Sequence, residues 1–198
     1  MKFSKVIGSH TGRIVIAAVP VAVAATLIVG GVANGAVPVS FAVSGSQFQI
    51  SADSLNGTGF SQYAGVTNDT EGKQHAVAIA NIANATLVNL CQSVVADTPL
   101  GKVGMLITAG GGDKPVTATN LQIGMTDLKG DAQFTNIRIG VDASHVNTDS
   151  KGTPGEFAQD ADGIKISGLQ QTAWSTTASV FTLNGMHVQL TDGSKGCF

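Results

Sequence analysis

The feature that most constrains this chain is a run without charged residues over 14–52. Its first part, Ile14–Ala33, is apolar except for Thr26 and follows a basic flank. Twenty helical residues rise about 30 Å, the thickness of the hydrocarbon core of a bilayer. A basic flank stays on the cytoplasmic side. We therefore predict a basic cytoplasmic flank over 1–13, a transmembrane anchor or signal segment over 14–36, and an exported domain over 37–198.

Two interpretations of the hydrophobic segment remain open. A signal anchor would keep the helix in the membrane, whereas a cleaved signal peptide has an apolar region of about 7–15 residues. The length of the run favours the anchor, and the small residues of Gly31–Gly35 offer cleavage sites. Pro20 would kink a spanning helix without excluding it. The expected location is the cell membrane with an extracellular domain, or the cell wall or medium if the segment is cleaved.

Charge is sparse in the exported part and excludes one class of partner. Three of the 11 basic residues belong to the flank, which leaves an acidic remainder, since the chain carries 13 acidic residues. Such a domain has no basic surface for nucleic acid. The expected partners are the membrane, through Ile14–Ala33, and an apolar ligand or lipid. A second copy joined through strand edges is also expected as a partner.

Apolar residues at every second position predict short strands separated by Gly, Asn and Asp turns. Turns are expected near Gly57–Gly65, at Gly110–Asp113 and at Asp127–Asp131, and a long loop at Asp142–Ala161. The pattern predicts a mainly β domain, either a single β-sandwich or a solenoid-like sheet, preceded by one hydrophobic helix. The expected strands are Gln47–Ala52, His75–Ala83, Asn84–Val95, Lys102–Ala109, Val116–Met125, Phe134–Val141, Ile164–Leu169, Ala178–Leu183 and Met186–Leu190.

The chain has two cysteines, Cys91 and Cys197. Export to an oxidising compartment favours a disulfide between them. The bond would close a loop of about 105 residues and stabilise the fold by about 4 kcal/mol. The alternative is a buried thiol at Cys91 and a free thiol at the C-terminus.

Three residues of the sequence have the types that a triad for ester hydrolysis needs. Ser54 follows Ala52-Asp53 in a block that is one residue short of the Gly-Asp-Ser-Leu block of one esterase class, and Asp142 and His145 have the Asp-x-x-His spacing of the same class. The three side chains would supply a nucleophile, a base and an orienting acid. However, the block has Ala52 in place of Gly, no oxyanion hole is evident, and the G-x-S-x-G motif is absent. We therefore predict no catalytic residues and keep Ser54, Asp142 and His145 as an alternative.

No metal or cofactor site is predicted. The chain lacks H-E-x-x-H and C-x-x-C motifs. Asp160–Gly163 begins like a calcium loop, but Ile164 and Lys165 stand where later ligands are needed. The single tryptophan, Trp174, is expected to fill the core or to face a ligand.

Three segments, 85–101, 119–140 and 168–190, together with the basic and apolar N-terminus and the terminal Cys-Phe, resemble an uncharacterised actinobacterial family of envelope or secreted proteins. Members of this family are often labelled cholesterol esterase. The resemblance extends over nearly the whole chain and brings no catalytic residues with it. We expect an exported, membrane-anchored envelope protein with a structural or binding role toward an apolar ligand or an envelope partner. The alternative is a hydrolase of lipid or sterol esters that uses Ser54.

Overall fold

The computed structural model describes residues 44–99 and 101–198. The hydrophobic segment predicted over 14–36 lies outside the described residues. No helix within them is long and apolar enough to cross a bilayer. The elements are β1 (Phe48–Asn68), β2 (Gln74–Val88), β3 (Leu90–Thr98), β4 (Gly101–Ala109), β5 (Val116–Thr135), β6 (Arg138–Asp142), the 3-10 turn η2 (Ala143–His145), β7 (Phe157–Thr177), β8 (Val180–Thr182) and β9 (His187–Thr191).

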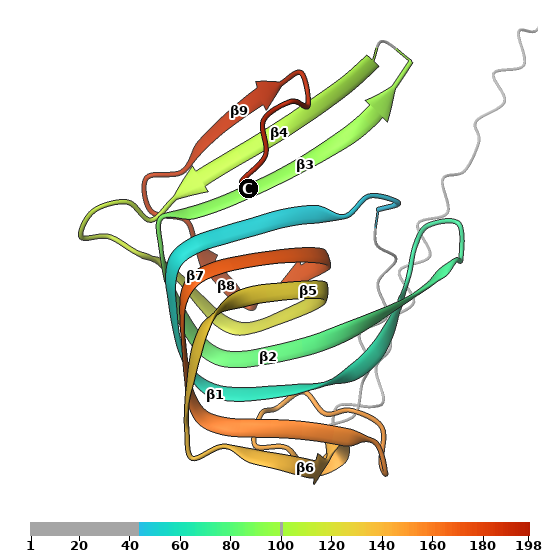
Figure 1. The fold of residues 1–198 in the computed structure, drawn as a ribbon, viewed down its shortest axis with the longest axis vertical. Helices are drawn as coiled ribbons and strands as arrows, with labels where there is room; N and C mark the ends of the chain where they lie inside the picture. The colour runs from blue at the N-terminus through green and yellow to red at the C-terminus, as the bar shows by residue number, and fades with distance from the viewer. Residues whose placement is uncertain (1–43, 100) are drawn as a thin grey trace, which may run out of the picture. The chain divides into compact units, whose positions relative to one another are not determined.

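The described residues form one nine-stranded antiparallel sheet, in the order β6-β7-β5-β2-β1-β3-β4-β9, with β8 added to β5. β7 also pairs with β1, so β1, β2, β5 and β7 form a closed ring of pairings (Figure 1). The prediction of a mainly β domain is confirmed. The sequence predicted either a sandwich or a solenoid-like sheet, whereas the observed strand pairings form one continuous sheet that closes on itself.

Three strands are far longer than expected. β1 and β7 have 21 residues each and β5 has 20, so the turns predicted at Gly57–Gly65 and Asp127–Asp131 are wrong. The loop predicted at Asp142–Ala161 ends earlier, where β7 begins at Phe157. The glycines mark bends within the strands. Gly59 and Gly130 have φ values of 65° and 149°, which glycine adopts without steric cost, and the β5–β7 register shifts beside Gly130.

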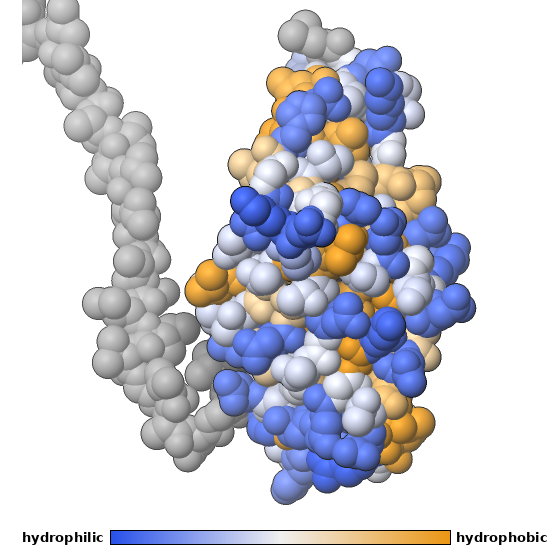
Figure 2. All heavy atoms as spheres, turned by 90° about the vertical axis from the view of Figure 1, so that its left-hand side faces the viewer, coloured by the Kyte–Doolittle hydropathy of each residue, from blue (hydrophilic) through white to orange (hydrophobic). Residues whose placement is uncertain are grey.

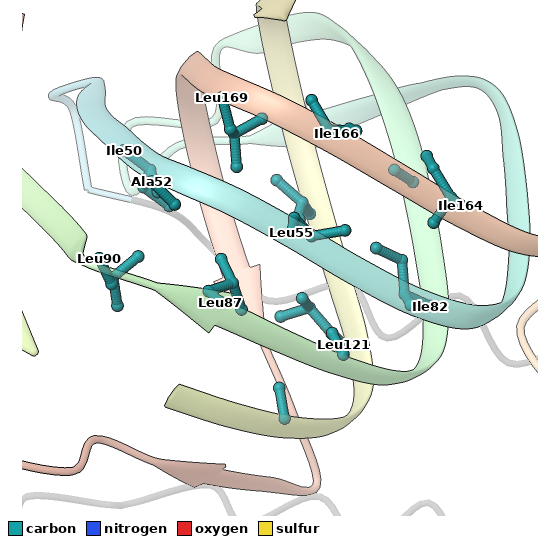
Figure 3. Packing of buried hydrophobic residues seen from close by; sticks show 14 of the residues in the cluster. Ile50, Ala52, Leu55, Ile82, Leu87, Leu90, Leu121, Ile164, Ile166 and Leu169 are labelled. Carbon is teal, nitrogen blue, oxygen red and sulfur yellow. The ribbon is translucent and has the colours of Figure 1, made fainter. Parts of the chain in front are cut away.

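The concave side of the bent strands encloses the main core. Leu55, Val116 and Leu169 are at most 2% exposed. Figure 3 shows aliphatic side chains from β1, β2, β5 and β7 pointing toward one another in the interior of the ring. Burying each such side chain contributes about 1.5–3 kcal/mol. Side chains therefore fill the ring.

A three-stranded extension, β3–β4–β9, continues the sheet beyond the ring. Asn89, in the left-handed conformation (φ 53°), separates β2 from β3 and directs the chain into this extension. The predicted disulfide is confirmed, because Cys91 on β3 is bonded to Cys197. The backbone amide of Cys197 donates to Ser93 Oγ at 3.1 Å. These contacts hold the C-terminal tail against β3.

We predict that Cys91→Ala combined with Cys197→Ala lowers the free energy of unfolding by about 4 kcal/mol, because the unfolded chain regains the freedom of a loop of about 105 residues. Chemical denaturation of the double variant and of the oxidised wild type measures the difference. The reduced wild type is the matched control and should lose a similar amount. A loss below about 1 kcal/mol would contradict the expectation.

Candidate functional site

A row of polar side chains crosses the sheet on the face opposite the main core. Ser61 lies opposite Asn81 and Asp160, Asn81 lies opposite Gln122, and Asp160 lies opposite Arg138. Residues at opposed positions of neighbouring strands point to the same face of a sheet. Ser61 and Asp160 are fully buried and Asn81 is 4% exposed, so another part of the chain covers the row.

The cover is the segment between β6 and β7, residues 143–156. Its Ala143 and Val146 pack with Tyr63 and Ala158 in a second, smaller hydrophobic cluster. Gly152 fits closely against this cluster, since a Cβ at that position would lie 2.7 Å from the Ala143 Cβ. The covering segment is therefore a packed part of the domain.

Asp160 fixes the covering segment to the sheet. Its carboxylate accepts hydrogen bonds from Arg138 Nε at 2.8 Å and Arg138 Nη2 at 2.6 Å, and from the backbone amide of Asn147 at 2.7 Å. The Arg138 guanidinium, with the Asn147 amide, holds the pKa of Asp160 below its ordinary value despite burial. The three hydrogen-bond donors offset the cost of burying the Asp160 carboxylate.

The row forms a continuous hydrogen-bond chain that runs in one direction. Gln122 Nε2 donates to Asn81 Oδ1 at 2.8 Å, and Asn81 Nδ2 donates to Ser61 Oγ at 3.1 Å. Ser61 Oγ lies 2.5 Å from Thr148 Oγ1, which donates to the Ser150 carbonyl at 3.1 Å. Each hydroxyl uses its one proton toward the next acceptor. Such a chain fixes the orientation of its members.

A groove of about 1120 Å³ opens between the outer face of β1, β2 and β5 and the segments 148–153 and 177–179. Asn81, Gln122 and Tyr63 contribute to its lining. Burial raises the pKa of the Tyr63 phenol, against the smaller effect of its hydrogen bond to Asn81, so Tyr63 stays protonated. Amide and hydroxyl groups both donate and accept hydrogen bonds. The arrangement can bind a polar ligand.

The structure brings Asp142 and His145 together. Asp142 precedes η2, and its Oδ1 accepts from the Ser144 amide at 2.8 Å and from Ser144 Oγ at 2.6 Å. His145 Nδ1 lies 3.7 Å from the same oxygen. The hydrogen bonds from Ser144, with that from the Gly155 amide, lower the pKa of Asp142 to about 2. Asp142 acts here as the cap of a short turn.

Ser54 lies at a different level of the sheet. It is opposite Ser167 on β7, whereas Tyr63 is opposite Ala158, the β7 residue that pairs with Val141 beside Asp142. The nine residues of β1 from Ser54 to Tyr63 correspond to about 30 Å of strand. The register therefore does not bring Ser54 to His145. Among the residues that the structure describes, no group of three or more His, Cys, Asp or Glu is arranged to hold a metal.

Trp174 belongs to neither of the two hydrophobic clusters described above. Its ring stacks on His75, with centroids 3.8 Å apart and an interplanar angle of 25°. His75 Nε2 lies 2.9 Å from Asp69 Oδ2. Trp174 is partly buried, so it supports the junction of β1 and β2 rather than the interior of the ring.

One signal for the polar row is visible in the sequence. Asn81 interrupts the apolar alternation of His75–Ala83 with an amide at a buried position. Ser61 fell in a segment interpreted as a turn, and Gln122 gave no signal of its own. Only the long-range register places the three together.

Residues 44–198 match the family described as "Family of unknown function (DUF6230)", and the chain belongs to this family. No curated protein and no solved structure matches it. The match establishes a family. The envelope location and the esterase label implied by the earlier resemblance are not part of its description.

We predict that Asp160→Asn lowers the free energy of unfolding by about 2 kcal/mol, because the charge-assisted hydrogen bonds to Arg138 and Asn147 weaken. Limited proteolysis should also cut residues 143–156 sooner. The matched control is Asp162→Asn, an exposed position two residues further along β7, with an expected loss within about 0.5 kcal/mol. Equal losses in the two variants would contradict a specific role for Asp160.

We predict that Asp142 contributes to stability in a pH-dependent way. Since its folded pKa is lowered to about 2, its contribution is fully present above the ordinary carboxyl range and is lost as pH falls through about 2. An NMR titration of the Asp142 carboxyl measures the pKa directly. The melting-temperature difference between the wild type and Asp142→Asn should shrink as the pH falls from 5 to about 2. A constant difference across this range would exclude the mechanism.

Proposed function

We propose that this chain is an exported binding domain of the cell envelope, tethered to the membrane through Ile14–Ala33. The basic flank and the apolar run support export with the N-terminus inside. The Cys91–Cys197 bond supports an oxidising compartment, because disulfides persist there and are rare in the cytosol. Both observations are consistent with a domain that works outside the cell membrane.

We propose the groove beside the polar row as the ligand site, and a neutral, hydroxyl-rich envelope glycan as its ligand. The observation that carries this proposal is that four members of the hydrogen-bond chain line the groove, namely Gln122, Asn81, Thr148 and Ser150. The buried Ser61 connects them from below and does not itself reach the groove. Preorganised amides and hydroxyls suit a ligand whose groups also donate and accept. The charges at the groove, Asp149, Lys151 and Glu156, have mixed signs and do not select a charged ligand.

Two other roles have less support. An apolar ligand inside the ring would compete with side chains such as Leu55 and Leu169, which fill that space. A sterol-ester hydrolase that uses Ser54 would need His145 within hydrogen-bond reach. The strand register separates the two by about 30 Å along β1.

We predict that Gln122→Ala weakens the binding of soluble neutral oligosaccharides by about tenfold, because a hydrogen bond contributes about 1 kcal/mol and the rest of the chain loses its fixed orientation. The matched control is Gln133→Ala, an exposed glutamine further along β5, which should bind as the wild type does. Isothermal titration with N-acetylated oligosaccharides and with unmodified glucans provides the measurement.

Three results would count against the proposal. Absence of binding to any oligosaccharide at millimolar concentration would remove the glycan ligand. Hydrolysis of sterol esters that Ser54→Ala abolishes would establish the esterase instead. Resistance of the domain to protease added to cells with a permeabilised outer layer would contradict export.

A further inference from the structure

The β3–β4–β9 extension has one face made of two rows of side chains. The first row is Gln92, Ile107 and Val188, and the second is Val94, Met105 and Leu190. Opposed residues share a face, so the six side chains lie together. None of them is charged, and five are apolar.

Half of this apolar face is open to solvent, and its other members, Gln92, Val94 and Ile107, are half-buried. Leu190 is 77% exposed, Val188 46% and Met105 37%. Figure 2 shows hydrophobic residues among polar ones near the upper end of the view, where β4 and β9 lie in Figure 1. Single exposed apolar residues are ordinary on protein surfaces, but a contiguous group marks an interaction site.

The opposite face of the extension differs in its charge and in its contact with other parts of the chain. The C-terminal tail covers it through the Cys91–Cys197 bond and the contact of Cys197 with Ser93. It also carries the charged residues of the hairpin, Asp97 and Lys102, which form an ion pair at 2.9 Å. The strand alternation therefore separates a face that carries the exposed Asp97–Lys102 pair and is covered by the tail at Cys91 and Ser93 from a face without charged residues.

The chain enters the domain beside the open face. Phe48, the first residue of β1, lies opposite Val94, so it extends the row that ends at Leu190. Three strand spacings separate Phe48 from Leu190, or about 14 Å. The chain from Ala33 to Phe48 takes 15 residue steps and spans at most roughly 54 Å. A tether of this length is compatible with contact between the open face and a bilayer that holds Ile14–Ala33.

We infer that the open face of β3–β4–β9 rests on the lipid bilayer. Leu190, Val188 and Met105 then insert between the acyl chains just below the lipid headgroups. The inference depends on the membrane tether in the proposed function and adds an orientation to it. An uncharged face suits a lipid surface, because insertion removes apolar area from water without burying a charge. The polar groove lies at a different level of the sheet, because it is lined by residues 63–68 of β1 whereas the extension pairs with β1 at residues 48–51.

The test uses the full chain reconstituted in phosphatidylcholine vesicles that carry brominated acyl chains. Trp174→Phe removes the only native tryptophan. In this background Leu190→Trp should be quenched by the brominated lipid several-fold more than Ile139→Trp. Ile139 is the matched control, since it is 65% exposed and lies on β6, at the other end of the sheet order. If Leu190→Trp does not fold, quenching of Val188→Trp measures the same face.

Each result decides between the two proposals. Strong quenching at position 190 and little at position 139 supports the orientation. Equal quenching in a protein that floats with the vesicles overturns the docking of this face and leaves the tether intact. Equal quenching with sedimentation as a dimer in detergent assigns the face to a second copy and also overturns it. Failure of the full chain to float with vesicles overturns both the tether and the orientation.

Discussion

The pairing of β1 with β7 is the interaction on which the rest of the fold depends. Without it, β1, β2, β5 and β7 would form an open sheet with two long edges and an exposed apolar face. Closing the ring removes those edges and gives the side chains around Leu55 an interior to fill. The same register aligns Ser61 with Asp160 on the outside. One set of hydrogen bonds therefore determines both the core and the polar row.

Closure requires long strands that bend, and the glycines permit this. A residue with a side chain resists a positive φ, whereas Gly59 and Gly130 adopt it readily and allow the strand to continue. Asn89 produces a sharper change and sends β3 out of the ring. The extension has little core of its own, and the disulfide compensates by fixing the tail to one of its faces.

The domain thus presents two surfaces of different chemistry. The groove beside residues 148–153 has a fixed set of amides and hydroxyls, and Asp160 and its partners hold the covering segment in place. The open face of β3–β4–β9 has apolar side chains without charge. The first surface suits directional hydrogen bonding and the second suits non-directional burial. The binding domain that we propose would use the first surface for its ligand and the second for the bilayer.

The sequence alone determined the β class and the approximate positions of β4 and β9, and it favoured the pairing of Cys91 with Cys197 over two free thiols. The strands follow from the local alternation of apolar and polar residues. The disulfide follows from the fact that each of the two cysteines has only the other as a partner. Strand lengths were underestimated, because a glycine that bends a strand looks like one that ends it. The closed ring and the polar row were decided only by the tertiary structure. Ser61, Asn81 and Gln122 are 20 and 41 residues apart along the chain. Only the register of three paired strands brings them together, and register is set by the simultaneous packing of the whole core.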